Sequence, residues 1–368
     1  MKTLLRLLLK SQHPRNRSEP AQTDKGMTLV ELLVGAIMAF LIITPMLGFV
    51  VDMLNTDRRE QVKSNTEQDV QAALDFIAQD LSQAIYIYDN NPAPTSTATT
   101  TATGIPALLA GKFIPPENPG TQTPILVFWK RRQIKYAVPV NTTTTTQPND
   151  CIRGETAPGT KGECNDTYVL SLVAYYQVND KQNTWCQPSG NDCPTRIARY
   201  EISDGVKNPN PPDPAKPYYY DPDTNNPYYA PHKAFNKEFD ISKPTENVTI
   251  VDKAWGAPEV LVNYIDHSPK ELAVDECQKA LGTPKTQIGL AAPTDVLEDT
   301  LKVTDKSSPK SINSFYACVD TSKNIARVTI RGNSLRRLQP TGADYDDKKS
   351  AYFPTASVQV QGLGATGK

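Results

Sequence analysis

Glu31 is the residue whose type and position most require a chemical explanation. It carries the only charge in the apolar run from Met27 to Val51, which is twenty-five residues long. About 20 apolar residues are enough for an α-helix to cross the hydrocarbon core of a bilayer. A carboxylate near the start of such a segment is costly in lipid, so it is usually paired or functional. The sequence therefore predicts a membrane-spanning helix over 27–51 and a chemical role for Glu31.

The segment before Met27 is cationic. Only two acidic residues, Glu19 and Asp24, oppose its basic residues, which are Lys2, Arg6, Lys10, Arg15, Arg17 and Lys25. The positive-inside rule keeps such a flank in the cytoplasm, so the rest of the chain is expected outside it. A secretory signal has its small residue after the apolar core, whereas Gly26 precedes the run here. Cleavage before Met27 would leave the hydrophobic helix on the mature chain.

The order Gly26-Met27-Thr28-Leu29-Val30-Glu31 resembles the processing site of type IV pilins and type II secretion pseudopilins. The resemblance implies that a prepilin peptidase cuts after Gly26 and methylates the new N-terminus at Met27. It also implies that Glu31 pairs with the N-terminal amine of a neighbouring subunit, which would relieve the desolvation of both charges. The leader of 26 residues is long for this family, and Met27 stands where Phe is more usual. The alternative is a plain single-pass anchor with an incidental glutamate.

All six cysteines follow the predicted membrane helix, on the side expected to be oxidising. An even number of cysteines in such a compartment favours disulfides, although fifteen pairings are available. Proximity in sequence favours Cys151–Cys164, Cys186–Cys193 and Cys277–Cys318. A zinc site is the competing interpretation, but the sequence has no Cys-x-x-Cys, and its three histidines are scattered.

A polar, amphipathic stretch continues from residue 52 to residue 90. Apolar residues recur there at spacings of three and four, which places them on one face of a helix: Val70, Ala73, Leu74, Ile77, Leu81, Ala84, Ile85 and Tyr88. Asp75 and Asp80 are expected on its polar face, in solvent or at a subunit contact. Pro45 is expected to bend or locally open the helix, because proline removes one intrahelical hydrogen bond. The apolar face requires a partner, which the later β-rich region would provide.

Beyond residue 90, strand candidates alternate with polar connectors. Two Thr-rich tracts, Pro92 to Thr103 and Asn141 to Gln147, have almost nothing to bury and are expected as exposed loops. Several strand candidates alternate apolar with polar residues, which is typical of a sheet with one wetted face. The candidates are residues 125–129, 134–138, 168–178, 197–202, 260–264, 325–330 and 357–360. The predicted fold is therefore α+β, a long N-terminal helix packed on an antiparallel head.

The segment from Lys207 to Pro231 contains eight prolines and five tyrosines and is expected as an extended surface loop. Its tyrosines either stack on sugar rings or a partner, or fold back onto the head. Two acidic clusters are candidate calcium ligands, although turn chemistry explains them more simply. They comprise Asp221, Asp223 and Asn225 in this loop and Asp344, Asp346 and Asp347 near the C-terminus.

A narrower resemblance covers more of the chain. The helical segment from Ala72 to Ala84 is similar to that of minor pilins of the J-type pseudopilin and PilW class. With Ile85 to Tyr88, the Thr- and Pro-rich loops and the segment from Ile325 to Asn333, it resembles the hormogonium polysaccharide secretion pseudopilins of filamentous cyanobacteria. This resemblance implies a minor subunit that supports polysaccharide secretion or gliding motility. The large, loop-rich head favours a priming or tip position over that of an abundant repeating subunit.

The sequence thus divides into a leader (1–26), a transmembrane and assembly helix (27–51), an amphipathic helix (52–90) and a periplasmic head (91–368). The family implies partners among other pilins, the prepilin peptidase and an inner-membrane assembly platform. A net charge of −1 gives no electrostatic footprint for nucleic acid. No catalytic, cofactor or phosphate-binding motif is present, so we expect no enzyme and no cofactor. The alternative function is a tip adhesin or glycan-binding module that uses the Tyr-rich loop.

Overall fold

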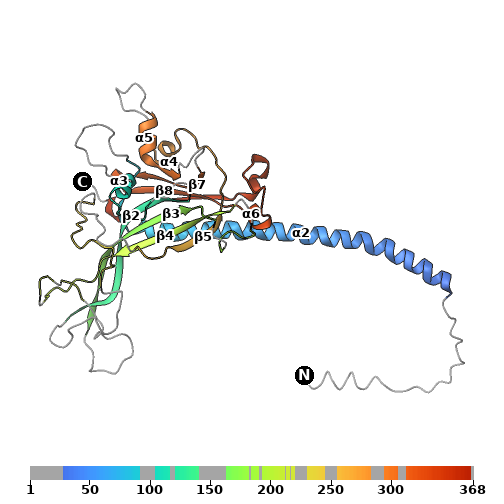
Figure 1. Ribbon diagram of the computed structural model, residues 1–368, viewed down its shortest axis with the longest axis horizontal. Coiled ribbons are helices and arrows are strands. Elements are labelled where there is room, and N and C mark those ends of the chain that lie inside the picture. The colour runs from blue at the N-terminus through green and yellow to red at the C-terminus, as the bar shows by residue number, and fades with distance from the viewer. Residues whose placement is uncertain are drawn as a thin grey trace, which may run out of the picture. The chain divides into compact units, whose positions relative to one another are not determined.

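The computed structural model describes twelve stretches of the chain (Figure 1). They are residues 28–91, 104–116, 121–140, 163–181, 184–189, 193–211, 213–215, 217–219, 230–244, 255–282, 294–305 and 312–365. Several predicted features lie outside them: Gly26, Met27, Cys151, Asp221, Asp223, Asn225 and both Thr-rich tracts. The chain divides into two compact units, Met1–Arg58 and Arg59–Lys368.

A single helix, α2, runs from Leu29 to Ser82 and contributes to both units. It includes Pro45 without a break. The predicted helix over 52–90 is too long, because strand β1 follows at Ala84–Ile87. The residues from Ile85 to Tyr88 are β-branched and aromatic, which suits a strand, and β1 pairs with the next strand of the sheet. The apolar spacing that suggested a helix continues past Ser82 although the backbone has changed.

Two antiparallel sheets form the second unit, so the α+β prediction is confirmed at this level. The first has five strands in chain order: β1, β2 (Gln122–Pro139), β3 (Cys164–Val178), β4 (Thr195–Ser203) and β5 (Glu259–Ile265). The second has four: β6 (Lys302–Asp305), β7 (Ile312–Asp320), β8 (Ile325–Arg331) and β9 (Thr355–Gln361). The strands predicted at 125–129 and 134–138 are one strand, because the polar residues between them pair with β3.

The part of α2 that belongs to the second unit packs in the core of the head. Its buried face contains Val70, Ala73, Leu74, Ile77 and Leu81, each at most 2% exposed, as the apolar spacing predicts. They share one apolar cluster with residues of both sheets. Burying a side chain of this size contributes about 1.5–3 kcal/mol relative to exposure, so this face is a major source of stability.

The five-stranded sheet is covered on both faces. Tyr175 and Arg199 lie directly opposite each other on β3 and β4, and both contact Asp80 of α2. On the other face, Trp129 stacks on Phe239 with ring centroids 3.9 Å apart. Helix α3 (Ile105–Ala110) adds Ile105 and Leu108 to the same core. Strands buried on both sides lose the strict alternation that marks a wetted sheet.

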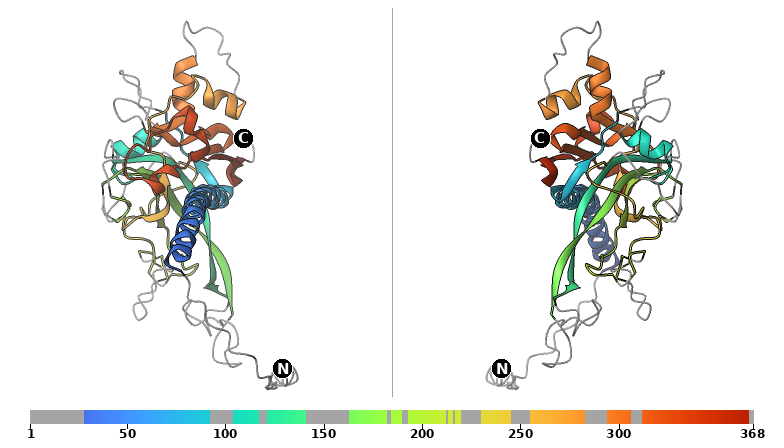
Figure 2. Two further views of the ribbon diagram at one scale, coloured as in Figure 1. Left: turned by 90° about the vertical axis from the view of Figure 1, so that its right-hand side faces the viewer. Right: turned by 90° about the vertical axis from the view of Figure 1, so that its left-hand side faces the viewer.

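The four-stranded sheet lies between α2 and two short helices, α4 (Glu276–Leu281) and α5 (Thr294–Leu301) (Figures 1 and 2). Tyr316 and Cys318 of β7 form a small cluster with Cys277 and Leu301 on the α4 and α5 side. The central strand β7 was not among the predicted strands. The remaining short helices are η2 (Thr321–Lys323), α6 (Leu335–Leu338), η3 (Asp347–Tyr352) and η4 (Leu363–Ala365).

Two of the predicted disulfides are present. Cys186 bonds Cys193, and Cys277 bonds Cys318, which ties α4 to β7. Cys164 is also disulfide-bonded, whereas Cys151 lies outside the described residues, so the pairing Cys151–Cys164 stays a prediction.

We expect the Cys277–Cys318 bond to stabilise the protein more than the Cys186–Cys193 bond does. Their sequence separations are 41 and 7 residues. Loop-closure entropy then predicts losses of about 4 and about 2 kcal/mol for the Cys277→Ala/Cys318→Ala and Cys186→Ala/Cys193→Ala variants, respectively. Urea unfolding of both variants in detergent measures the difference, and equal losses or the reverse order would contradict it.

Candidate functional site

The first part of α2, in the unit that ends at Arg58, is apolar and exposed. The twenty residues from Leu32 to Val51 contain no charged side chain, and a helix of this length spans about 30 Å. Every large apolar side chain from Leu29 to Leu54 is at least 47% exposed. Among the described residues, this is the one helix long and apolar enough to cross a membrane. So large an apolar surface indicates contact with lipid or with other apolar helices.

The start of α2 gives Glu31 a local role that sequence analysis missed. Thr28 Oγ1 accepts a hydrogen bond from the Glu31 backbone N–H at 3.3 Å, and the Thr28 carbonyl accepts from the same N–H at 3.0 Å. Thr-x-x-Glu is the spacing of a capping box, and an acid in the first turn also suits the helix dipole. The motif was visible in the sequence. Pairing of Glu31 with another subunit remains a prediction.

Pro45 lies inside the apolar segment. It has no N–H to donate to the carbonyl four residues earlier, and the neighbouring Thr44 Oγ1 donates to the Phe40 carbonyl at 2.8 Å. A hydroxyl turned onto the backbone in this way is satisfied without water, as a helix in lipid requires. The expected bend at Pro45 remains a prediction.

Asp80 is buried near the end of α2, so the prediction that it lies on a polar surface is wrong. Its carboxylate accepts from Lys130 Nζ at 2.7 Å, Arg199 Nε at 2.9 Å and Tyr175 Oη at 2.7 Å. Glu201 completes the group by accepting from Arg199 Nη2 at 2.5 Å. Two acids and two bases therefore balance in the core. The helix is fastened to the five-stranded sheet by hydrogen bonds to three of its strands.

The charges in this group hold one another in their ionised forms. Burial raises the pKa of Asp80, but the attraction of Arg199 and the contacts with Lys130 outweigh it, so the pKa falls below its ordinary 3.8. Burial and the same cations act on Glu201, whose pKa is lowered from 4.5. Burial alone would lower the pKa of Arg199, but Glu201 and Asp80 raise it. Asp80, Glu201 and Arg199 therefore stay charged at neutral pH.

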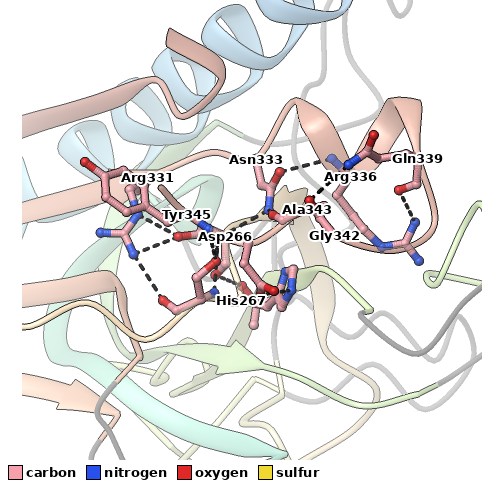
Figure 3. A network of polar contacts seen from close by, with 12 residues as sticks. Asp266, His267, Arg331, Asn333, Arg336, Gln339, Gly342, Ala343 and Tyr345 are labelled. Atoms are coloured by element: carbon pink, nitrogen blue, oxygen red, sulfur yellow. Dashed lines mark hydrogen bonds and ion pairs between the residues drawn. The ribbon is translucent and has the colours of Figure 1, made fainter. Parts of the chain in front are cut away.

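A second polar network joins the two sheets (Figure 3). Asp266, fully buried after β5, accepts from Arg331 Nε at 2.7 Å, Ser268 Oγ at 2.7 Å and Asn333 Nδ2 at 3.2 Å. The backbones of the two segments are also hydrogen-bonded, since Asp266 N donates to the Arg331 carbonyl at 2.9 Å. A buried carboxylate with this many donors is satisfied. The network therefore fastens the end of β5 to the end of β8.

Two further side chains in Figure 3 extend this network. Arg336, fully buried, donates Nη2 to the Pro188 carbonyl at 2.6 Å, and its own N–H donates to Asn333 Oδ1 at 3.0 Å. His267 Nε2 lies 3.2 Å from Asp344 Oδ1. The bond from Arg336 to Pro188 fixes the loop of the Cys186–Cys193 disulfide. These contacts explain the buried polar residues here as structural.

The remaining candidate sites are only partly described. Tyr218 and Tyr219 fold back onto the head: Tyr219 is 4% exposed, and the Tyr218 ring lies near Lys207 and Lys237. Asp346 caps η3 by accepting from Lys348 N at 2.9 Å, which is the turn chemistry expected there. Within the described stretches, no three His, Cys, Asp or Glu side chains are grouped to bind a metal.

Comparisons with the models of protein families, with curated proteins and with solved structures give no match to this chain. The assignment of function therefore depends on the residues and the geometry described above.

We expect Asp80→Asn to lower the free energy of unfolding by about 3–5 kcal/mol, because it removes one partner of a buried ionic group. Asp75→Asn is the matched control. Asp75 lies on the same helix but is exposed and accepts a hydrogen bond from Gln71 Nε2 at 3.1 Å, so a change within about 0.5 kcal/mol is expected. Urea unfolding in detergent measures both. Equal effects would show that Asp80 is not fastening the helix.

Low pH should reduce the stabilisation that the buried carboxylates of Asp80 and Glu201 give to the fold. An acid whose pKa is lowered on folding stabilises the fold above its unfolded pKa, and this stabilisation is lost as the pH falls through the folded value. For Asp80 and Glu201 the loss therefore begins below about pH 4.5. The Asp80→Asn/Glu201→Gln variant should lose less unfolding free energy between pH 5 and pH 3 than the unmodified protein. An equally steep loss would assign the acid sensitivity to other carboxylates.

Proposed function

We propose that this chain is a pilin-like subunit of a type IV pilus or a type II secretion-like pseudopilus. The observation that carries the proposal is the composition of α2. Its first part has membrane length, no charge from Leu32 to Val51 and an exposed surface, while its second part forms the core of an antiparallel α+β head. One part of this helix can span a bilayer, and the other part belongs to the core of the head. Such a helix suits a subunit that starts in a membrane and then packs against other helices.

In this proposal the cytoplasmic leader is removed after Gly26 by a prepilin peptidase, and Met27 becomes the methylated N-terminus. The processed chain is held in the inner membrane with its head outside the cytoplasm. The two disulfides support this side, because disulfides persist in oxidising compartments. Glu31 then pairs with an N-terminal amine during assembly, where each charge reduces the desolvation cost of the other.

We further propose a minor subunit at a priming or tip position, with an assembly platform, other pilins and the prepilin peptidase as partners. The head supports this, because it contains two sheets and long connections that are bulky for every position of a shaft. Polysaccharide secretion or gliding motility is the process suggested by the sequence resemblance. No catalytic role is assigned. The adhesin alternative has less support, since Tyr218 and Tyr219 contact the head.

The mature N-terminus tests the proposal. We expect mass spectrometry of the chain from its normal host to find a methylated N-terminus at Met27, and to find the leader intact when the prepilin peptidase is deleted. A Gly26→Leu variant should keep its leader in both strains, because the bulky side chain occupies the cleavage position. An Ala21→Leu variant, changed within the leader, is the matched control and should be processed normally. An intact leader on the unmodified chain in the normal host would contradict the proposal.

A further inference from the structure

Strand β9 forms one edge of the four-stranded sheet and pairs only with β8 among the described strands. Hydrogen bonds at its two ends establish which backbone groups face β8. Gly332 N donates to the Pro354 carbonyl at 2.8 Å, and Gly362 N donates to the Asn324 carbonyl at 2.9 Å. Backbone groups alternate in direction along a strand, so the even-numbered residues between them face β8. The N–H and C=O groups of Thr355, Ser357, Gln359 and Gln361 therefore point out of the sheet.

Within the described part of the chain, the side chains also indicate that no further strand covers this edge. Ala326, Val328 and Ile330 of β8 are 0% exposed, whereas the residues opposite them on β9, Val360, Val358 and Ala356, are only half-buried. Both sets belong to the same core face. On this face of the sheet, the apolar side chains of β8 are therefore fully covered, whereas those of β9 are only partly covered. One more strand with apolar residues on this face would cover them fully.

The other sheet edges are protected. β1 has four residues, and its Ala84 and Ile87 carbonyls accept from Asn324 Nδ2 and Thr321 Oγ1. β6 also has four residues, and Asn90 Nδ2 donates to its Lys302 carbonyl. The end of β5 bonds to the residues that follow β8. In contrast, β9 has seven residues, no charge, no proline and no register shift, so it lacks the usual protection of an edge strand.

A second copy of β9 is a poor occupant. Gly332, beside Pro354, packs against Thr66 and Val70 of α2, and Gly362 packs against Ala84 after α2. The Arg59–Ser82 part of α2 therefore runs in the same direction as β9. Two β9 strands paired antiparallel would place two α2 helices antiparallel, whereas subunits inserted in one membrane share one polarity. Two parallel β9 strands would have to be related by a two-fold axis that runs along the strands. That rotation would place Val358 and Val360 of the two copies on opposite faces of the joined sheet.

We infer that β9 is a docking edge that accepts an extended strand from a different subunit of the filament. The partner strand is uncharged and alternates apolar with polar residues. Its backbone bonds the outward groups of β9, and its apolar residues cover Val358 and Val360. This inference rests on the proposed function, and it adds a head-to-head contact to the packing of N-terminal helices. Strand addition of this kind takes its affinity from backbone hydrogen bonds.

Ser357→Pro tests the inference in the full chain. It removes one outward N–H and leaves the bonds to β8 intact. Ser357→Ala is the matched control, because it loses the same hydroxyl but keeps the N–H. We expect the processed Ser357→Pro chain to be at least tenfold less abundant than Ser357→Ala in sheared filaments, with equal amounts of both in the membrane. Equal incorporation would overturn the inference while leaving the proposed function intact.

Two further results make the test complete. If Ser357→Pro does not fold, Gln359→Lys with Gln359→Ala as its control provides the same comparison, because a lysine protects an edge from strand pairing.

In filaments of the unmodified chain, the Ser357 and Gln359 amides should exchange hydrogen at least tenfold more slowly than in the detergent-solubilised subunit, and unchanged rates would overturn strand addition. Absence of the unmodified, processed chain from filaments would instead contradict the proposed function.

Discussion

The head depends on burying one face of α2 against two sheets, and Asp80 is the most demanding part of that contact. A carboxylate inside a core is tolerated only when its charge is matched and its oxygens accept hydrogen bonds. Lys130, Arg199 and Tyr175 meet both requirements, and they come from three neighbouring strands. The order of β2, β3 and β4 is therefore linked to the position of the helix. A shift of α2 by one turn would separate Asp80 from all three donors.

The same reasoning applies where the two sheets meet. Their strands do not form one continuous sheet, so their relative position is fixed by the bridge between Ile265 and Gly332 and by the donors around Asp266. Gly332 also allows Thr66 of α2 to approach, because a Cβ there would lie 2.7 Å from Thr66 Cγ2. Polar groups and a close backbone contact thus define the junction, and the apolar core supplies most of the stability. Such a junction is directional, whereas apolar burial alone is not.

Among the described residues, two surfaces remain incomplete in a single copy. The uncharged part of α2 exposes apolar side chains along its whole length, and β9 exposes backbone groups beside half-buried valines. The first surface suits lipid or other helices, and the second suits a strand. In the proposed function, a subunit that leaves a membrane for a filament needs both a surface that exchanges lipid for protein and a contact with defined register. Strand pairing supplies register, because a slip by one residue reverses the faces of all its side chains.

The sequence by itself determined the features that depend on local spacing. The apolar run from Met27 to Val51 identified the membrane-length helix, and the recurrence of Val70, Leu74, Ile77 and Leu81 identified its buried face. Strand candidates were located to within a few residues in β2 to β5, β8 and β9, and proximity gave the pairs Cys186–Cys193 and Cys277–Cys318. Gly26, Met27 and Cys151 lie outside the described residues, so their predicted roles still depend on sequence.

Only the tertiary structure decided the features that depend on distant partners. Asp80 lies at the spacing of the buried face, three residues after Ile77, but its donors Lys130, Tyr175 and Arg199 are 50, 95 and 119 residues away, so local spacing did not show that a buried acid would be paired there. The end of α2 at Ser82 depends on pairing of β1 with β2. The open edge of β9 follows from the sheet order. Local spacing establishes which face of a segment is apolar, but burial of a charge and exposure of an edge depend on which segments meet in space.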